Sequence, residues 1–390
     1  MQSVKCDILI CGSGLAGLSL LYRAIKAGLW IDKTIIVVDQ SGKSENDRTW
    51  SFWKDSPSDF DEVIYKEWKN LSFFDNNGNQ ICLKSGNYTY NSIRSIDFYN
   101  HIFSFIKDFT NITFVQSVVE EIISTADKCI LKTNTHTYTA TYLFNSLYKK
   151  PELKVGEQYF LQHFKGVKIS TKSVIPKPTD AYLMDFRTSQ QEGTTFFYTL
   201  PTANNELFVE YTLFSKSVLP AKVYEKEIAK YLTNVLKITD YEILEDEYGV
   251  IPMTDHQFKR FDGNIVHIGT IGGDTRASTG YTFTNTQKTI GKIISSFKNS
   301  GHPFFINETI GLKQHLYDAT LLNVLAERKY EGHQLFTDLF KNTKASVIFS
   351  FLDAETSILQ DVQIMKSLKI FPFLKAFAAA VCRNMLSNKS

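Results

Sequence analysis

A glycine-rich turn between a short apolar strand and a helix constrains the fold of this chain more than any other feature. It lies in DILICGSGLAGLSLLYRAIKAG, residues 7–28. Gly12 allows a tight turn, and Gly17 lets the helix pack closely on the preceding strand. The helix carries one apolar face, made by Leu18, Leu21 and Ile25. The pattern predicts the first strand, turn and helix of an α/β domain with a Rossmann-type sheet.

A second apolar strand, TIIVVDQ, follows the helix and ends at Asp39, 22 residues after Gly17. An acid at this distance can accept a hydrogen bond from an adenosine ribose, while a pyrophosphate lies on the helix N-terminus. The segment therefore predicts dinucleotide binding, and an unrelated glycine-rich turn is the alternative. The expected contacts come from Gly12, Ser13, Gly14, Ala16, Gly17 and Asp39.

A second glycine segment, GNIVHIGTIGGDTRASTGYTFTNTQ, covers residues 263–287. It predicts a strand over 265–268 and a helix that begins near Thr279. A late strand and turn that return to an N-terminal nucleotide fold favour FAD over NAD, because they can hold the ribityl chain and isoalloxazine ring. The expected contacts are Gly269, Gly272 and Gly273. Arg94, just ahead of the helical stretch IRSIDFYNHIFSFI, is either a cofactor anchor or a surface charge.

One acid, Glu210, lies among bulky and mostly apolar neighbours in LFVEYTLF. The stretches TTFFYTLP and ELFVEYTLF, joined by TANN, predict a β-hairpin or two neighbouring antiparallel strands. Alternation places Phe208, Glu210, Thr212 and Phe214 on one face, and Val209, Tyr211 and Leu213 on the other. Both faces are largely apolar, so we expect the strand to be covered on both sides. Glu210 is then either a pocket acid or a structural carboxylate with a partner.

The upstream stretch AYLMDFR brings a further carboxylate, Asp185, with Leu183 and Arg187 on its face of the strand. An ion pair with Arg187 is one interpretation. A second polar group lining the pocket of Glu210 is the other.

Charge and cysteine usage exclude several classes of protein. The 43 basic and 41 acidic residues give a net charge of +2, which does not indicate nucleic acid as a partner. The five scattered cysteines form no CxxC pair and fit a reducing cytoplasm, and the eight histidines lack metal-ligand spacing. We therefore expect no metal site. The aromatic content of 14% leans toward an apolar substrate.

The C-terminal 25 residues combine apolar side chains with five basic ones and no acid. The basic residues are Lys366, Lys369, Lys375, Arg383 and Lys389, interleaved with Ile370, Phe371, Phe373, Leu374, Phe377 and Val381. Such a tail either lies on an anionic bilayer surface or packs on the protein as an amphipathic helix. No apolar run approaches the roughly 20 residues that span a bilayer, and the N-terminus is not typical of a signal peptide.

Taken together, these segments resemble the flavin-dependent lycopene cyclases, in the bacterial form that makes β-rings. The matching stretches run in family order across roughly residues 5–290: DILICGSGLAGLSL, NDRTWSFW, YNSIRSIDFYNHI, YLFNSL, AYLMDFR, FVEYTLFS, YGVIPMTD and GTIGGDTRASTGYTF. FVEYT carries the family's FxExT signature at Phe208, Glu210 and Thr212. YLFNSL differs from the ADG-type segment of aromatic hydroxylases. Residues 305–390 match only loosely.

The pattern and the resemblance together predict an α/β fold with three parts. The first is a Rossmann-type FAD-binding domain made by residues 1–70, 90–148 and 256–300. A substrate domain with a mixed or antiparallel β-sheet, residues 71–89 and 149–255, is interleaved with it. A mainly helical C-terminal region, residues 301–390, follows.

The resemblance implies an isomerase, an intramolecular lyase of carotenoid biosynthesis that converts the ψ-ends of lycopene to β-ionone rings. Glu210 would be the acid and base, working with reduced FAD, with NAD(P)H as the reductant. Burial among Phe208, Phe214 and Tyr211 can raise the pKa of a glutamate by up to about 3–5 units, which would keep Glu210 neutral. The other expected substrate contacts are Trp50, Phe52, Trp53, Asp185, Phe208 and Thr212. Core packing is the alternative for Trp50 and Trp53.

Two other functions stay open: an FAD-dependent monooxygenase or reductase acting on a polyene, and a binding module that delivers carotenoid without chemistry. The FxExT signature disfavours both functions, because neither of them needs a buried proton donor at Glu210. We expect a cytoplasmic protein, peripheral on the inner face of the cell membrane. The sequence leaves open the exact carotenoid, β- against ε-rings beyond the resemblance, one or two cyclised ends, and the oligomeric state.

Overall fold

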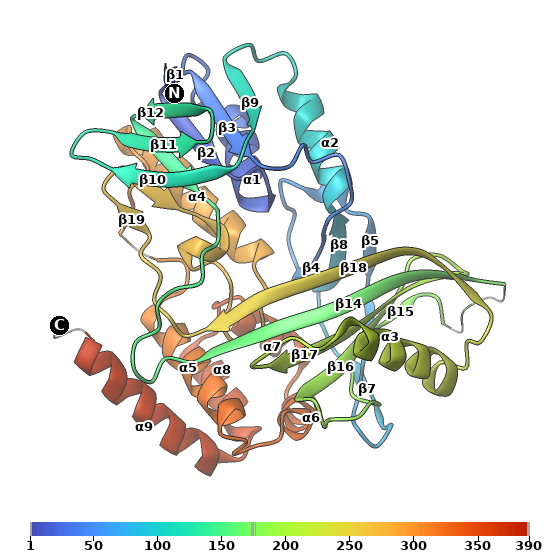
Figure 1. Ribbon diagram of the computed structural model, residues 1–390. Coiled ribbons are helices and arrows are strands. Elements are labelled where there is room, and N and C mark those ends of the chain that lie inside the picture. Colours follow the sequence, from blue (N-terminus) through green and yellow to red (C-terminus); the bar gives the residue numbers. More distant parts are fainter. Residues whose placement is uncertain (1, 173–174, 176, 307, 388–390) are drawn as a thin grey trace.

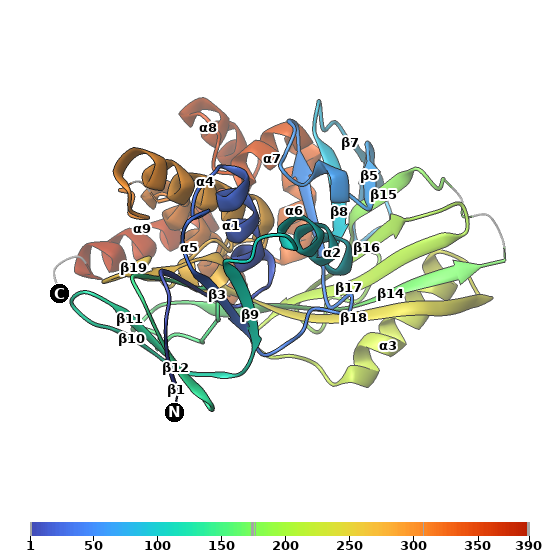
Figure 2. The same ribbon diagram turned by 90° about the horizontal axis from the view of Figure 1, so that it is seen from above.

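The computed structural model describes residues 2–172, 175, 177–306 and 308–387, whose strands form four sheets (Figure 1). A six-stranded sheet at the N-terminal end carries the first glycine turn. A seven-stranded sheet lies at the opposite end of the molecule from the small four-stranded sheet (Figure 2). A cluster of helices from the C-terminal part of the chain packs beside the large sheet.

The six-stranded sheet is the doubly wound part of the fold. Its order is β19 (Phe261–Asp262), β20 (Ile265–His267), β13 (Tyr142–Asn145), β2 (Ile8–Cys11), β3 (Ile35–Asp39) and β9 (Ile112–Gln116). The strands from β20 to β9 are parallel, and β19 pairs antiparallel with β20. Because the order reverses at β2, the crevice at its carboxyl end is where such sheets bind ligands.

Alternate residues of the parallel strands pack on different layers. Ile8 and Ile10 face α1 (Leu15–Lys26), α2 (Ser95–Ile106) and α4 (Phe283–Ser300). Leu9 and Cys11 face the four-stranded sheet, ordered β1 (Gln2–Lys5), β12 (His136–Ala140), β11 (Cys129–Thr133) and β10 (Val119–Ser124). Both faces of the parallel sheet are therefore covered, which explains its continuous apolar strands.

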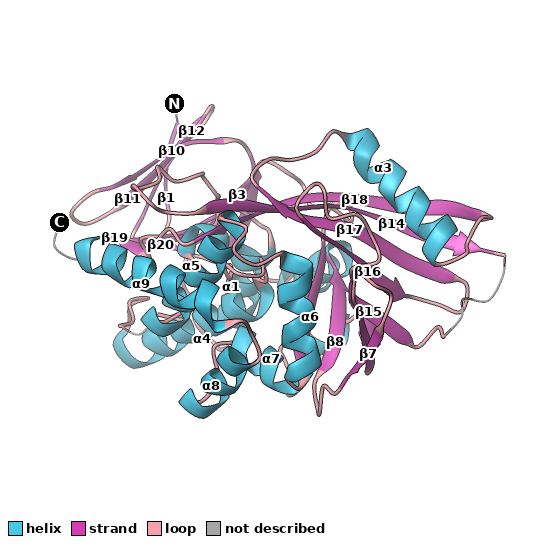
Figure 3. Cartoon of the chain, turned by 90° about the horizontal axis from the view of Figure 1, so that it is seen from below, coloured by secondary structure: helices cyan, strands magenta, loops and turns pink. Residues whose placement is uncertain are grey.

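The seven-stranded sheet is antiparallel apart from one parallel pair, β15 with β6. Its order is β18 (Tyr241–Thr254), β14 (Tyr159–Thr171), β17 (Glu206–Ser215), β16 (Thr194–Pro201), β15 (Asp180–Asp185), β6 (Asn70–Phe74) and β7 (Gln80–Leu83). One face packs against α3 (Ala221–Lys230) and the π-helical turn Tyr231–Val235 (Figure 3). The other faces the C-terminal helices.

A three-stranded sheet lies between the two larger parts (Figure 1). Its order is β4 (Thr49–Lys54), β8 (Thr89–Arg94) and β5 (Lys66–Trp68). Two short 3-10 turns complete this part of the fold, Asp61–Val63 and Gly269–Gly272. The strand β4 delivers aromatic side chains in two directions. Phe52 packs in the core around α1, whereas Trp53 packs in the core below the large sheet.

The C-terminal region is helical: α5 (Leu312–Ala326), α6 (Gly332–Asn342), α7 (Ala345–Leu352), α8 (Ile358–Lys366) and α9 (Ile370–Ser387). A capping box starts α8, in which the Ser357 side chain accepts from the Gln360 N–H and the Gln360 side chain returns to the Ser357 N–H. No helix in the described part of the chain is long and apolar enough to cross a membrane.

The main elements expected from the sequence are confirmed. The first strand, turn and helix are β2 and α1, and the second apolar strand is β3, which ends at Asp39. The hairpin is β16 and β17, and the strand β17 is covered on both faces. The helix expected near Thr279 begins later, at Phe283.

Candidate active site

The first glycine turn joins β2 to α1 and leaves its backbone open. Gly12 has φ +89°, which favours glycine. A Cβ at Gly17 would lie 1.9 Å from the Gly12 carbonyl oxygen, so only glycine permits this helix to approach the strand. A Cβ at Gly14 would meet nothing within 4 Å. No side chain caps α1 at Gly14, so the helix N-terminus is left for an anionic ligand.

Asp39 stands beside this turn. Its Oδ2 accepts a hydrogen bond from the Ser13 N–H at 2.6 Å, and its Oδ1 accepts from the Ser41 N–H at 2.8 Å. Lys43 Nζ lies 3.5 Å from the same carboxylate. Asp39 therefore fixes the turn and sits at the edge where a ribose would follow a pyrophosphate.

The second glycine turn follows β20 and touches the first. A Cβ at Gly269 would lie 3.0 Å from the Ala16 Cβ, and one at Gly272 would lie 2.4 Å from the His267 carbonyl oxygen. Gly273 ends the turn in the left-handed region, at φ +80°. The six-stranded sheet thus brings together two glycine turns from segments about 250 residues apart in sequence.

A buried acid that sequence reasoning did not include, Asp274, organises the second turn. Its carboxylate accepts from the Gly269 N–H at 2.7 Å, the Thr289 hydroxyl at 2.6 Å and Arg260 Nη2 at 2.8 Å. Burial raises its pKa, and the Arg260 charge opposes that shift. Its place directly after Gly273 in GGDTR was the available signal.

Arg94 lies at the start of α2, as the sequence predicted, but it is engaged by its own helix. Its guanidinium makes two bonds to Asp97, at 2.7 and 2.9 Å, and lies 4.5 Å from the centre of the Tyr65 ring. It lines a small cavity with Lys168 and Glu247. Its geometry here is that of a local ion pair.

Glu210 lies in a cavity of about 110 Å³ between the large sheet, β4 and the loop before α4. On β17 it stands between Gly166 of β14 and Tyr198 of β16. Because Gly166 has no side chain, the Phe208 ring can lie over its backbone. The lining comprises Thr49, Trp50, Ser51, Tyr90, Gln162, Phe164, Tyr198, Leu200, Phe208, Glu210, Ile251, Thr279, Gly280, Tyr281, Thr282 and Phe283.

The surroundings of Glu210 favour its neutral form. Its Oε1 accepts a hydrogen bond from the Thr212 hydroxyl at 2.6 Å. Protein atoms surround the carboxyl closely, and this burial raises its pKa to about 8, with a smaller contribution from the Glu247 charge. The Thr212 bond opposes the rise. At neutral pH the side chain is therefore mostly a carboxylic acid, able to donate a proton.

The aromatic residues around Glu210 differ in part from those expected. Phe208, Trp50 and Phe164 line the cavity. Tyr211 instead lies on the opposite face of β17, in the core under α3. The prediction that Tyr211 helps to bury Glu210 was wrong, because alternate residues of a strand face opposite sides.

Glu247 on β18 is a second half-buried carboxyl near Glu210 that sequence reasoning missed. Its Oε1 accepts from the Thr49 N–H at 3.2 Å, and burial raises its pKa. It lies in the acid-rich stretch YEILEDEYG. No feature of that stretch marked it.

Three tyrosine hydroxyls meet at the inner end of the Glu210 cavity. Tyr281 contacts Tyr90 at 3.1 Å and Tyr198 at 3.3 Å between hydroxyl oxygens. Trp53 packs its edge on Tyr281, with ring centres 4.3 Å apart. The tyrosines were not predicted, although Tyr281 lies in the quoted STGYTF and Tyr198 in TTFFYTLP.

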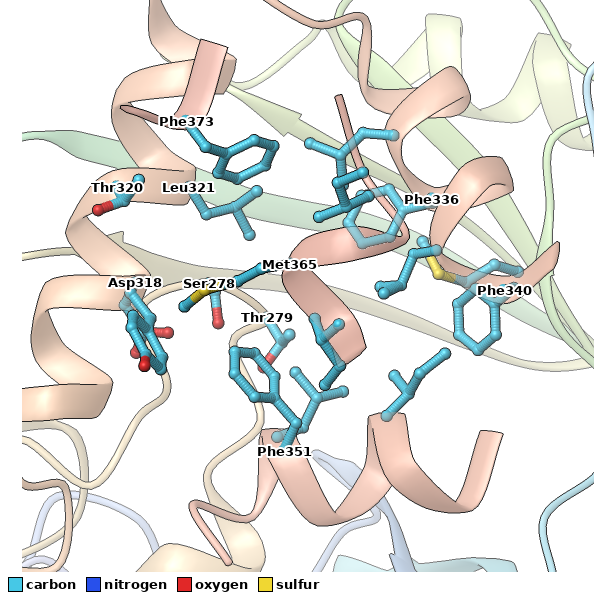
Figure 4. A pocket seen from close by; sticks show the side chains of 18 of the residues that line it. Ser278, Thr279, Asp318, Thr320, Leu321, Phe336, Phe340, Phe351, Met365 and Phe373 are labelled. Atoms are coloured by element: carbon cyan, nitrogen blue, oxygen red, sulfur yellow. The ribbon is translucent and has the colours of Figure 1, made fainter. Parts of the chain in front are cut away.

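A larger apolar cavity of about 430 Å³ adjoins the first. Tyr198, Thr279 and Tyr281 line both. Figure 4 shows Ser278 and Thr279 facing Met365 of α8 across it. Most of its lining comes from the C-terminal helices, which sequence reasoning had assigned only as a helical region.

Three expected substrate contacts, Asp185, Phe52 and Thr212, line neither cavity, and the Thr212 hydroxyl instead donates to Glu210. The Asp185 carboxylate is fully buried and binds Arg187 Nε at 2.9 Å and the Tyr231 hydroxyl at 2.5 Å. It faces α3 and lines neither cavity. The Phe52 ring stacks on Phe283 at 4.1 Å inside the core around α1. Trp53 does line the apolar cavity, with its Nε1 donating to Asp353 Oδ2 at 2.7 Å.

The residues fit a dinucleotide cofactor that extends from the glycine turns toward Glu210. The uncapped start of α1 and the open space above Gly14 suit a pyrophosphate. At the other end, the buried Gln162 Oε1 and the Thr279 hydroxyl have no hydrogen-bond partner among the described residues. Both line the Glu210 cavity, where a polar ring edge would satisfy them.

Solved structures share this fold at low sequence identity. The chain is similar to a geranylgeranyl bacteriochlorophyll reductase-like protein from Thermoplasma acidophilum, with TM-score 0.59, 12% identity, and coverage of 97% of this chain and 96% of that one. It is similar to a flavoprotein/dehydrogenase from Cytophaga hutchinsonii, with TM-score 0.60, 12% identity, and coverage of 93% and 100%. It is also similar to p-nitrophenol 4-monooxygenase from Pseudomonas putida, with TM-score 0.58, 11% identity, and coverage of 100% and 98%.

The architecture is therefore that of the flavoproteins with a Rossmann-type FAD domain. Comparison with curated proteins gave no match. The family model described as "Lycopene cyclase protein" matches residues 7–378, nearly the whole chain, so the chain belongs to the lycopene cyclase family. The match extends well beyond residue 290, into the C-terminal helices that line the apolar cavity.

Proposed function

We propose that the protein is a lycopene β-cyclase, which converts the linear ψ-ends of lycopene to β-ionone rings without net oxidation or reduction. The observation that carries the proposal is Glu210, an acid with a pKa raised to about 8 in a cavity that shares lining residues with a larger apolar one. One cavity borders the loop that follows the second glycine turn. The other is apolar enough for a polyene.

FAD is the proposed cofactor, with NAD(P)H as the source of its electrons. The backbone of Gly12–Gly17 would hold the pyrophosphate, Asp39 the ribose, and Gly269–Gly273 the ribityl chain. Bound in its reduced form, the flavin would supply a negative charge worth about 4 kcal/mol toward a cation 4 Å away at an effective dielectric of 20. The loop Thr279–Phe283 and Gln162 would position its ring edge beside Glu210.

Glu210 starts and ends the reaction. Its proton adds to the terminal double bond of the ψ-end and leaves a tertiary carbocation. The C5–C6 double bond attacks this cation and closes the ring. The C6 proton then returns to the Glu210 carboxylate, so the product is an isomer of the substrate. The Thr212 hydroxyl, which donates to Oε1, keeps the carboxyl in one orientation through both transfers.

The walls of the cavity protect the cation. The rings of Trp50 and Phe208 offer π-faces, each worth about 2 kcal/mol toward a desolvated cation. The apolar lining also excludes water, which would otherwise add to the cation and give an alcohol. Residues that bind the non-reacting part of the polyene line the apolar cavity, with Trp53 at its inner end.

The second candidate is an FAD-dependent monooxygenase or reductase that acts on an isoprenoid or polyene. Its support is that the similar structures include proteins described as reductase-like and as a monooxygenase. Product mass separates the candidates, because a monooxygenase adds one oxygen and a reductase adds two hydrogens. A neutral acid beside the loop favours the cyclase.

The proposed place of action is the cytoplasmic side of the cell membrane, with the protein peripheral on its surface. Lycopene is apolar and partitions into lipid, so an enzyme that uses it gains from lying on that surface.

The direct experiment expresses the chain in lycopene-accumulating cells and analyses the pigment by mass and absorption. We expect a product isomeric with lycopene, and we expect Glu210→Gln to abolish turnover while flavin binding is retained. Glu206→Gln is the matched control, because Glu206 lies on the same strand but pairs with Lys168 at 2.9 Å. Equal activity of the Glu210→Gln protein would refute the proposal.

A further inference from the structure

The seam between α8 and α9 exposes an unusual amount of large apolar surface. Leu359 is 83% exposed, Phe371 is 82% exposed and Ile358 is 75% exposed. The same seam includes the exposed side chains of Val362, Met365, Ile370, Leu374 and Phe377. These eight residues, here called the seam patch, come from two consecutive helices that lie at the edge of the molecule (Figure 3). A patch of this size on a water-exposed surface indicates a binding face.

The seam patch is also the outer end of the apolar cavity. Met365, Ile370, Leu374 and Phe377 are exposed to solvent and at the same time line the cavity. The inner end of the same cavity reaches Trp53, Tyr198 and Tyr281, next to Glu210. One continuous apolar path thus runs from the surface at α8 and α9 to the proposed site of chemistry.

Charge around the seam patch is one-sided. Lys366, Lys369 and Lys375 are exposed between its apolar residues. Within residues 358–383 the single acid is Asp361, which is 1% exposed and accepts from Lys313 Nζ at 2.9 Å. The nearest acid from a neighbouring element with a recorded effect is Glu327 at the end of α5, which interacts with Lys375. Lysines that frame an apolar face are complementary to an anionic lipid surface.

We propose that the seam patch docks on an anionic lipid bilayer and is the entrance through which a polyene passes from the hydrocarbon layer into the apolar cavity. This inference rests on the proposed function for the identity of the substrate, but the docking itself does not depend on it. A polyene that entered through water would expose its whole apolar length to solvent, which is unfavourable. A cavity entrance in contact with the lipid avoids that exposure.

This placement changes the surface expected from the sequence. The basic tail was expected over residues 366–390, yet three of the most exposed apolar residues belong to α8 or the first turn of α9. Arg383 turns inward and pairs with Asp255 at 3.0 Å. Lys389 lies outside the described residues. The docking face is therefore centred on residues 358–377.

Vesicle flotation of the full-length protein tests the docking. The probes are phosphatidylcholine vesicles with and without an added anionic phospholipid. We expect the wild-type protein to float with the anionic vesicles and the Leu359→Ser/Phe371→Ser protein to bind at least tenfold less. The Lys366→Gln/Lys369→Gln/Lys375→Gln protein should lose the preference for anionic lipid. An Ile31→Ser/Ile243→Ser control changes two exposed apolar residues elsewhere and should float like wild type.

Two outcomes would overturn the inference. One is equal flotation of the wild-type and Leu359→Ser/Phe371→Ser proteins. The other is a wild-type dimer in analytical ultracentrifugation that these two substitutions dissociate, because the seam patch would then bind a second copy of the chain.

Activity assays separate this inference from the proposed function. Leu359 and Phe371 do not line the cavity, so their serine variants should cyclise lycopene in detergent micelles at the wild-type rate and lose at least tenfold in rate with vesicle-borne lycopene. Equal loss in both assays would contradict a docking role. A wild-type protein that floats but cyclises lycopene in neither assay would overturn the proposed function alone.

Discussion

Tyr198 on β16 lies directly opposite Glu210 on β17, so a tyrosine that lines both cavities shares one face of the sheet with the proposed proton donor. Through its hydroxyl, Tyr198 also contacts Tyr281, which in turn contacts Tyr90. The chemistry proposed for Glu210 therefore takes place beside a set of phenol hydroxyls, two of which, those of Tyr198 and Tyr281, also line the apolar cavity.

The first prediction concerns this set of tyrosines. Tyr281→Phe removes both hydroxyl contacts and leaves the Tyr90 and Tyr198 hydroxyls with fewer partners in a buried place. We expect the free energy of unfolding to fall by about 1–3 kcal/mol, measured by urea titration. The control is Tyr148→Phe, which breaks a similar 2.9 Å hydroxyl pair with Tyr159 at the surface. A loss at Tyr148 as large as the loss at Tyr281 would contradict the argument.

The second prediction concerns the pH dependence of turnover. Because burial raises the Glu210 pKa to about 8, the acid form predominates at neutral pH and is lost above that value. The cyclisation rate in detergent should be level from about pH 6 to 7.5 and then fall roughly tenfold per pH unit above the pKa. A rate that instead rises through this range would mean that the ionised form is the active one.

The third prediction concerns stability and pH. The pKa of Glu210 is near the ordinary glutamate value of 4.5 when the chain is unfolded and about 8 when it is folded. The unfolded chain therefore loses this proton first, so the stability that Glu210 contributes is complete below about pH 4.5 and is lost as pH rises to about 8. Near pH 9 the Glu210→Gln protein should be more stable than wild type, by on the order of a few kcal/mol.

Thermal unfolding of both proteins at about pH 5 and pH 9 checks this prediction. The difference between Glu210→Gln and wild type should grow in favour of glutamine as pH rises. A difference of the same size and sign at both pH values would show that Glu210 is not held neutral by the fold.

The fourth prediction separates two glycines of the first turn. Gly14→Ala adds a methyl group to open space, so the chain should fold with near wild-type stability but bind FAD at least tenfold more weakly. Gly17→Ala places a methyl 1.9 Å from the Gly12 carbonyl oxygen, so it should disrupt the packing of α1 on β2. Flavin absorbance of the purified proteins and circular dichroism measure the two effects. Full flavin occupancy in the Gly14→Ala protein would show that the pyrophosphate does not bind at this turn.

The fifth prediction assigns Asp185 to stability. Asparagine removes the negative charge and one of the two oxygens that bind the Arg187 guanidinium at 2.5–3.1 Å. We expect Asp185→Asn to lower the free energy of unfolding by about 3–5 kcal/mol and to leave the Michaelis constant for lycopene unchanged. A raised Michaelis constant with unchanged stability would show that Asp185 contacts the substrate and would contradict this prediction.

Local patterns in the sequence predict the parts of the site that depend on neighbouring residues. The two glycine turns need glycine for reasons of space and backbone angle, and both form where the pattern places them. The hairpin was predicted but its register was not, because a four-residue TANN loop would pair Pro201 with Glu206, whereas the structure pairs Pro201 with Leu207 and therefore Tyr198 with Glu210. Domain boundaries, in contrast, stay a prediction.

The rest of the site depends on contacts between distant segments. The Trp53 partner Asp353 lies 300 residues away, and the apolar cavity is lined by five C-terminal helices and strands of the large sheet. Asp185 was ambiguous for the same reason, since Tyr231 of the turn after α3 completes its environment. Periodicity reports which face of an element is apolar, but it does not report which element covers that face.

Infrared difference spectroscopy of the flavin-bound protein tests the central claim most directly, by following the protonated carboxyl band of Glu210 against pH. A neutral buried glutamic acid predicts a band that is present at pH 7, disappears with a midpoint near pH 8, and is missing from Glu210→Gln. A spectrum in which Glu210 is already ionised at pH 6 would contradict the account.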